Sequence, residues 1–205
     1  MKKKIFGRVY EFSYTPKYKE LIKEALYLYD NAYDELPDVV INISDNNSAR
    51  DIILQNPKIH RKTKQGMSTN FGVLDAHWAW NEIKALEIDA ELIPGKKGLV
   101  GFYKKLGSME YPTELETFGQ ILHELILVPS CYFFPDVALI HAACVSKSGN
   151  AALLAGTGGT GKSSALLTFR NSNEYEFVSD DITIVNESGF AFGNMAWPKV
   201  YGYNC

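Results

Sequence analysis

A run of glycines followed by a lysine and a serine constrains this chain more than any other feature of its sequence. Residues 156–163 read Gly-Thr-Gly-Gly-Thr-Gly-Lys-Ser, the pattern G-x-x-x-x-G-K-[ST] that is typical of a phosphate-binding loop, or P-loop. Glycines let the backbone wrap closely, so that several N–H groups point at one anion. In this pattern Lys162 supplies a positive charge for the β- and γ-phosphates, and Ser163 supplies a hydroxyl to Mg²⁺. The run therefore predicts a site for ATP, or another nucleoside triphosphate, together with Mg²⁺.

The residues on either side of the loop match the strand and the helix that a P-loop needs. The short apolar run 151–155 is typical of a buried strand, and 163–170 reads as a helix. The N-terminus of that helix would add partial positive charge and free N–H groups to the loop. The alternative is a glycine-rich structural turn with an incidental lysine after it. The order strand, loop, helix favours the phosphate site.

Two adjacent acids follow the loop at a spacing that suits a metal site. The segment 177–184 reads Phe-Val-Ser-Asp-Asp-Ile-Thr-Ile, a strand that ends in Asp180 and Asp181. Phosphoryl transfer needs one carboxylate to hold the metal ion and another to orient or deprotonate the attacking hydroxyl. Neighbouring side chains at a strand end point to opposite sides of the chain, so the pair can divide these tasks. Asp is also common at ordinary strand ends, but beside a P-loop we interpret the pair as functional.

A histidine interrupts the apolar strand that precedes the loop. The runs 137–146 and 151–155 flank the turn Lys-Ser-Gly-Asn at 147–150, which predicts an antiparallel hairpin. His141 lies in the first run, where a lone histidine is usually a satisfied core or edge residue. Because this strand pairs with the P-loop strand, the alternative is that His141 contacts the phosphates or binds the metal ion.

Three segments in this order resemble the HPr kinase/phosphorylase-like family, whose nucleotide-binding core is related to phosphoenolpyruvate carboxykinase. They read Ile-His-Ala-Ala at 140–143, Leu-Leu-Ala-Gly-Thr-Gly-Gly-Thr-Gly-Lys-Ser-Ser at 153–164, and Val-Ser-Asp-Asp at 178–181. The resemblance covers residues 137–193. It implies an α/β P-loop core with a mixed sheet. It also implies an ATP- and Mg²⁺-dependent kinase acting on a serine of a small protein or peptide, as in some peptide-modification pathways.

Carried over by position, the resemblance implies a role for each residue of the site. Asp180 is implied to be the base toward the serine hydroxyl, and Asp181 and Ser163 to bind Mg²⁺. His141 and Lys162 are implied to act in catalysis. The residues expected to bind the nucleotide are Gly156, Thr157, Gly158, Gly159, Thr160, Gly161, Lys162, Ser163 and Ser164. The bifunctional members of the family carry an acid at the position of Ser164, so a phosphorylase activity is in doubt.

The chain before this region has no recognisable catalytic grouping. Apolar patterns predict strands at 5–14, 38–43, 71–76, 82–92 and 99–105, helices at 16–29 and 47–55, and a polar loop at 57–70. A longer helix at 113–128 has one broad apolar face and is expected to pack on the second core. We therefore predict a small α+β region at 1–112 and a P-loop kinase-like domain at 113–205. Kinase-type relatives continue further, which implies either a fragment or a partner that completes the substrate site.

The composition of the chain indicates which partners and which cellular location to expect. A net charge of −3 gives no electrostatic reason to expect nucleic acid. No apolar run of about 18 residues and no signal-peptide core is present, so no membrane partner is expected. The three cysteines are widely spaced, which suits a reducing cytoplasm. Whether the chain forms a homo-oligomer stays open.

Two other functions are compatible with a P-loop. One is a nucleotide-binding regulatory module without transfer activity. The other is a different P-loop NTPase, such as a transport or assembly ATPase, which needs an arginine supplied by an oligomer. Arg170 is the only arginine after residue 61, and the acid pair follows the loop closely. These features favour the kinase.

Overall fold

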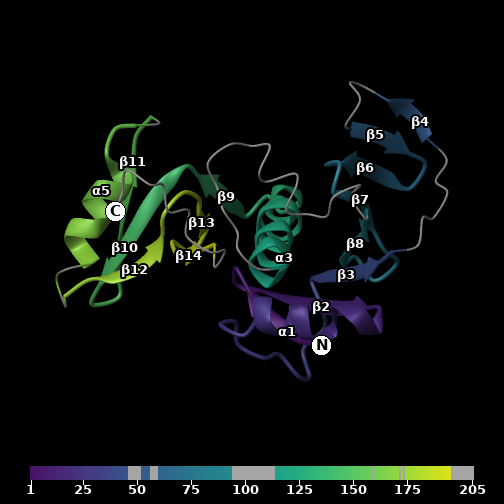
Figure 1. The fold of residues 1–205 in the computed structure, drawn as a ribbon, viewed down its shortest axis with the longest axis horizontal. Helices are drawn as coiled ribbons and strands as arrows, with labels where there is room; N and C mark the ends of the chain where they lie inside the picture. The colour runs from purple at the N-terminus through teal and green to yellow at the C-terminus, as the bar shows by residue number, and fades with distance from the viewer. Residues whose placement is uncertain are drawn as a thin grey trace. The chain divides into compact units, whose positions relative to one another are not determined.

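The computed structural model describes residues 1–45, 52–55, 60–93, 114–157, 159–170, 172 and 174–194, and it divides the chain into two compact units. The first is Met1–Leu127 and the second is Val128–Cys205 (Figure 1). This boundary lies later than the predicted one at residue 112. The reason is that helix α3 (Glu114–Leu122), which we expected on the second core, packs against helix α1 (Lys19–Ala25) of the first unit.

A mixed eight-stranded sheet forms the body of the first unit, in the order β1-β2-β3-β8-β7-β6-β5-β4. Strand β3 pairs in parallel with β2 and β8, and the other neighbours are antiparallel. The strands are β1 Lys2–Ile5, β2 Arg8–Tyr14, β3 Val39–Ser44, β4 Ile52–Gln55, β5 His60–Thr63, β6 Gly66–Asn70, β7 Leu74–Trp80 and β8 Leu86–Leu92. An α/β fold with a mixed sheet is therefore confirmed, although we expected the mixed sheet around the P-loop.

Alternating side chains divide this sheet into an apolar face and a polar face. In β3, Ile41 and Ile43 are buried, whereas Asn42 between them donates hydrogen bonds to Glu87 (3.1 Å) and Asp89 (3.0 Å) of β8. Period-two alternation of this kind is typical of a strand with one face in the core. The buried apolar positions of the central strands thus form one side of the first core, and apolar residues of α1 and α3 also belong to that core.

Several predicted elements of the first unit are wrong. The predicted strand 5–14 is confirmed over Arg8–Tyr14 but not at its start, because Phe6 and Gly7 adopt φ values of 51° and 77° and reverse the chain between β1 and β2. The predicted helix 47–55 is wrong over Ile52–Gln55, which form β4. The predicted loop 57–70 contains the strands β5 and β6. The predicted strand 99–105 lies outside the described residues.

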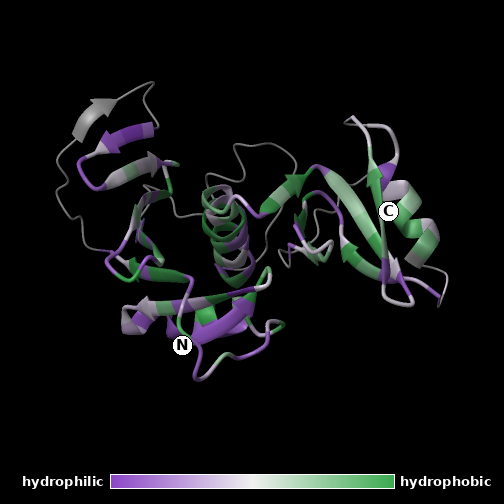
Figure 2. Ribbon diagram, turned by 180° about the vertical axis from the view of Figure 1, so that it is seen from behind, coloured by the Kyte–Doolittle hydropathy of each residue, from purple (hydrophilic) through white to green (hydrophobic). Residues whose placement is uncertain are grey.

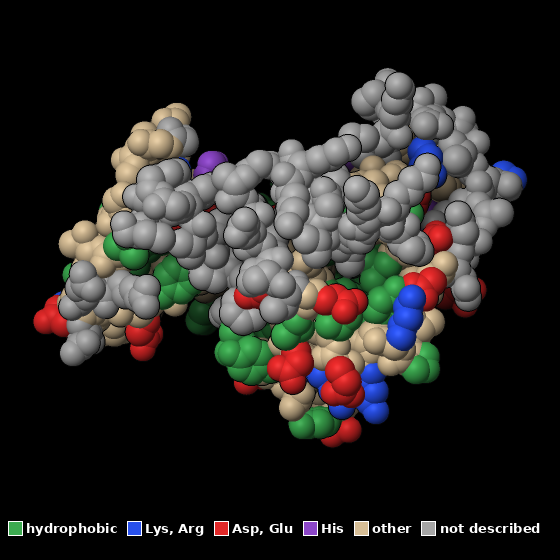
Figure 3. Space-filling view, in the orientation of Figure 1, with side chains coloured by type: hydrophobic (Ala, Val, Ile, Leu, Met, Phe, Trp, Pro, Cys, Tyr) green, Lys and Arg blue, Asp and Glu red, His purple; other side chains and the backbone are tan. Residues whose placement is uncertain are grey.

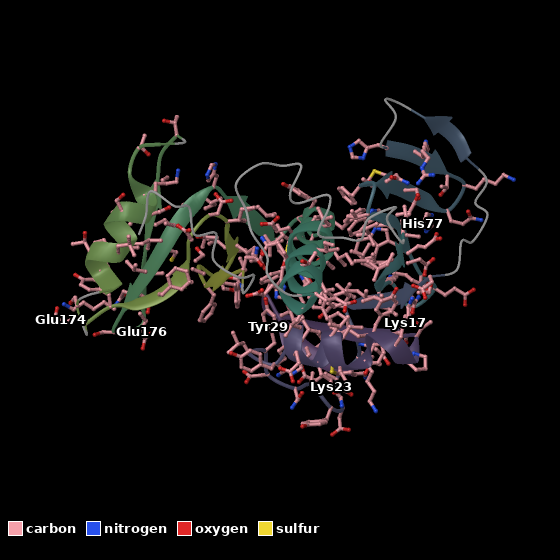
Figure 4. All side chains as sticks on the ribbon, in the orientation of Figure 1. Lys17, Lys23, Tyr29, His77, Glu174 and Glu176 are labelled. Carbon is pink, nitrogen blue, oxygen red and sulfur yellow. The ribbon has the colours of Figure 1, made fainter. Side chains whose placement is uncertain are left out.

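Helix α3 continues as a π-helical turn at His123–Leu127, followed by the short helix α4, Val128–Ser130. Aromatic rings fix this helix within the first unit: Phe118 stacks on Tyr18, and His123 stacks on Tyr29 at a centroid distance of 5.8 Å. Figure 4 marks Tyr29 near the end of α3. Among the helices that the structure describes, none is long and apolar enough to cross a membrane.

The second unit contains two three-stranded sheets, ordered β11-β10-β12 and β14-β13-β9, in which all neighbours are antiparallel. Its strands are β9 Val137–Ile140, β10 Ala142–Lys147, β11 Asn150–Ala155, β12 Glu176–Ser179, β13 Thr183–Asn186 and β14 Ala191–Gly193. Helix α5, Lys162–Arg170, packs on β10 through Leu166, which contacts Ala143 and Val145. Figure 2 shows green, apolar stretches in both elements. A small core between helix and sheet therefore supports the loop that joins β11 to α5.

The predicted hairpin at 147–150 is confirmed, since β10 and β11 pair over their full length. The prediction that the P-loop strand is buried is wrong. Within the described residues β11 pairs only with β10, and most of its side chains are exposed, with Leu153 at 40%. Leu154 is the half-buried apolar residue of β11, and it packs against the core between α5 and β10.

Candidate functional site

The loop between β11 and α5 has the open, glycine-dependent backbone that a phosphate nest requires. Gly159 and Gly161 adopt φ values of 78° and 87°, a region that favours glycine. No described atom lies within 4 Å of where a Cβ would stand at either position. Thr160 closes the loop by donating its hydroxyl to the carbonyl oxygen of Thr157 at 2.8 Å. Such a backbone presents its N–H groups to an anion and leaves room for it.

The ammonium group of Lys162, the first residue of α5, lies against this loop. Its Nζ atom donates hydrogen bonds to the carbonyl oxygens of Gly156 (2.8 Å) and Thr157 (3.2 Å). The first N–H groups of a helix have no intrahelical partner, so the helix start adds further partial positive charge at this point. A flexible lysine stem allows the ammonium group to move from these carbonyls to a bound phosphate.

The serine that follows the lysine is joined to the acid pair. Ser163 Oγ donates a hydrogen bond to Asp180 Oδ1 at 3.0 Å, which links the start of α5 to the end of β12. Two oxygen ligands in adjacent positions around Mg²⁺, each at about 2.1 Å, are about 3 Å apart. The observed spacing of these two oxygens therefore fits Mg²⁺. The described residues contain no cluster of three or more His, Cys, Asp or Glu side chains suited to a metal, and Mg²⁺ ordinarily takes only one or two carboxylates beside phosphates and water.

The second acid pairs with the histidine. His141 Nε2 lies 3.0 Å from Asp181 Oδ1, and the two side chains are 61% and 56% exposed. A contact between side chains as exposed as these contributes little to stability. The exposure leaves the carboxylate of Asp181 accessible to a substrate, which is the property that a general base needs.

Two passages of the chain between the sheets bring these residues together. The predicted strand 137–146 is broken at His141, because β9 belongs to one sheet and β10 to the other. The chain makes the opposite passage at 180–182, between β12 and β13. Ile140 pairs with Thr183, and Cys144 pairs with Ser179, so the two passages lie side by side. The break in the strand therefore places the histidine at the acid pair.

The structure brings together most of the predicted site. Gly158 lies outside the described residues, and Ser164 is exposed on α5, where its carbonyl oxygen accepts a hydrogen bond from Thr168. We expected Ser163 to share the metal with Asp181, but its hydrogen bond is to Asp180, which favours the opposite division of tasks between the acids.

Two hydroxyl residues beside the acids were not predicted. Ser179 and Thr183 are buried at either end of the acid turn and hydrogen-bond to each other. The only sequence signal was a polar residue at each strand end, which is too common to single them out. Comparisons of the chain with models of protein families, with curated proteins and with solved structures gave no match. Support for a function therefore comes from the geometry of the site.

Proposed function

We propose that this chain is an ATP- and Mg²⁺-dependent kinase that transfers the γ-phosphoryl group to a serine hydroxyl of a small protein or peptide. The observation that carries the proposal is the hydrogen bond between Ser163 and Asp180, because it joins two oxygens at a spacing that suits Mg²⁺ beside the glycine-rich loop. The serine acceptor follows from the resemblance to the HPr kinase/phosphorylase-like family. The finer fold, a P-loop core of that family's type, is part of the same proposal.

The nucleotide-binding part of the site is built from the loop and the helix start. The loop amides and Lys162 hold the phosphates, and Ser163 and Asp180 hold Mg²⁺. When bound, the ion offsets the negative charge of the β- and γ-phosphates. These groups lie in the loop after β11, at the start of α5 and in the turn that follows β12, all of which belong to the second unit. Positioning and electrostatics supply most of the acceleration in phosphoryl transfer.

The transfer step uses the other acid. The Asp181 carboxylate accepts the proton of the serine hydroxyl as the serine oxygen bonds to the γ-phosphorus. The bond between that phosphorus and the oxygen bridging to the β-phosphate breaks, and ADP leaves with the electron pair. His141, at 3.0 Å, orients the Asp181 carboxylate. This arrangement reverses the roles that the resemblance implied for the two acids.

Mass spectrometry of serine peptides incubated with Mg·ATP and the chain tests this proposal. A gain of one phosphoryl group is expected on peptides with serine and none on matched peptides with alanine. Lys162→Ala should reduce transfer by at least about a hundredfold, because it removes a cation that stabilises charge on the transferred group. Transfer at the wild-type rate by Lys162→Ala would reject the assignment of the loop. Nucleotide binding by the wild-type chain without any transfer would instead support a regulatory module.

The proposal includes a cytoplasmic location and no nucleic-acid or membrane partner. The free, buried thiol of Cys144 supports a reducing compartment. Burial raises the pKa of the Cys144 thiol, so it stays protonated and is not a candidate nucleophile. On the face shown in Figure 3, acidic and basic side chains are interspersed around the N-terminal helix, and a surface of mixed sign does not attract a polyanion.

A further inference from the structure

The acid turn between β12 and β13 is tied at its base by buried hydroxyl groups. Ser179 Oγ and Thr183 Oγ1 are 2.5 Å apart, and Thr183 Oγ1 donates to the carbonyl oxygen of Ala142 at 2.9 Å. Because the Thr183 proton is directed to Ala142, the proton between the two hydroxyls comes from Ser179. All three residues are at most 1% exposed. The hydroxyls therefore form a directed chain of hydrogen bonds from β12 through β13 to β10.

This chain of hydrogen bonds connects the two passages that carry the candidate catalytic groups. Ser179 directly precedes Asp180, and Ala142 directly follows His141. The backbone is also tightly packed here, since a Cβ on Gly193 of β14 would stand 1.7 Å from the carbonyl oxygen of Val178. Sheet pairing fixes the strands on either side, whereas the hydroxyls fix the turn between them.

We propose that Ser179 and Thr183 are positioning residues that hold Asp180 toward Ser163 and Asp181 toward His141. The inference rests on the proposed function of the site. Its physical basis is that a buried hydroxyl is unfavourable unless hydrogen-bonded, while valine fits a buried strand position at least as well as threonine. Both ends of the turn nevertheless carry hydroxyls, between apolar neighbours such as Ile184 and Cys144. Their role is therefore to orient the turn through hydrogen bonds rather than to fill space in the core.

The isosteric change Thr183→Val tests the positioning role, because it keeps the shape and removes the hydroxyl. We expect kcat for transfer to fall by about tenfold to a hundredfold, the effect of misplacing a reacting group by up to about 1 Å. The Mg²⁺ concentration for half-maximal activity should rise, while KM for ATP should change by less than about twofold because the loop is untouched. Thr183→Ser retains the hydroxyl and should keep near-wild-type kcat.

A merely structural role predicts a different pattern. Thr183→Ser would then be the more harmful change, because it leaves a small cavity, and kcat in both variants would follow their melting temperatures. That result, or a folded Thr183→Val with wild-type kcat and Mg²⁺ dependence, would overturn the inference. Thr168→Val on α5 makes the same chemical change at an exposed hydroxyl and is the matched control, expected to leave kcat unchanged.

Amide hydrogen exchange separates this inference from the proposed function, because it needs no activity. Exchange within 179–183 should be at least about tenfold faster in Thr183→Val than in the wild-type chain, with α5 unaffected. Ser179→Ala, which removes the other end of the same chain of hydrogen bonds, should give the same acceleration, and the double variant no more than either. Unchanged exchange in both single variants would overturn the positioning role, whereas wild-type protein without transfer activity would overturn only the kinase.

Discussion

At the scale of single residues, the account depends on which carboxylate faces the start of α5. Asp180 is half-buried and accepts a hydrogen bond from Ser163, whereas Asp181 is 56% exposed and pairs with His141. A half-buried oxygen joined to a serine hydroxyl suits a metal ligand. An exposed carboxylate held by an imidazole suits a base that must contact an incoming substrate. The two acids are adjacent in sequence, yet their surroundings differ enough to give them separate tasks.

The division between the acids can be tested by substituting each with its amide. Asp181→Asn should retain Mg·ATP binding and lose at least about a hundredfold in kcat, since general-base catalysis contributes at least that factor. Asp180→Asn should weaken Mg²⁺-dependent nucleotide binding by about tenfold, or about 1.4 kcal/mol. Calorimetric titration and the transfer assay give the two readouts. The reverse pattern would show that Asp180 is the base and Asp181 the metal ligand.

At the scale of elements, the end of α3 contains a buried titratable group. His123, in the π-helical turn, is 1% exposed and stacks on Tyr29. Its Nδ1 lies 2.7 Å from the carbonyl oxygen of Gly119, to which it donates in the neutral tautomer. Burial lowers the pKa of His123 to about 4, despite the opposing effect of that carbonyl. The folded helix end therefore favours the neutral imidazole.

This burial predicts a loss of stability in acid. An unfolded histidine has a pKa near 6.5, so between pH 6.5 and 4 the unfolded chain binds a proton that the folded chain excludes. The free energy of unfolding therefore falls as the pH decreases through that window, by about 3 kcal/mol in total for this group. Above pH 6.5 the contribution is constant. Urea unfolding at pH 7 and pH 4.5 measures the loss.

Substitution separates this effect from the titration of carboxylates in the same range. His123→Phe keeps an aromatic ring against Tyr29 and removes the titrating group, so its loss of stability between the two pH values should be clearly smaller. His60→Gln, at an exposed position, is the control and should behave as the wild-type chain does. An equal pH dependence in the wild-type chain and His123→Phe would contradict the account of the helix end.

At the scale of the whole molecule, local signals were predictable from the sequence and long-range pairings were not. The glycine-rich loop, the helix after it and the hairpin before it depend on neighbours in sequence, such as Gly149 at a φ of 77° in the turn. In contrast, β5 and β6 are polar strands whose side chains bond to the neighbouring strand β7: Arg61 pairs with Asp75, and Asn70 donates to the same carboxylate. Period-two apolar alternation, the usual strand signal, is therefore lacking there.

The same contrast applies to the candidate site. The motifs predicted which residues form the candidate site, but not which of them are in contact. Those contacts depend on the order β11-β10-β12, in which β10 separates the strand before the glycine-rich loop from the strand before the acids. That order, together with the break at His141, determines that Ser163 meets Asp180 and that His141 meets Asp181. Neither the break nor the hydroxyl pair at 179 and 183 leaves a distinctive local pattern.

Calorimetric titration of the chain with a non-hydrolysable ATP analogue, with and without Mg²⁺, tests the central claim most directly. We predict binding that weakens by at least about tenfold when Mg²⁺ is removed, and that is lost in Lys162→Ala while Thr168→Val binds as the wild-type chain does. An affinity that is the same with and without Mg²⁺ and in Lys162→Ala would contradict the account, as would the absence of binding by the wild-type chain.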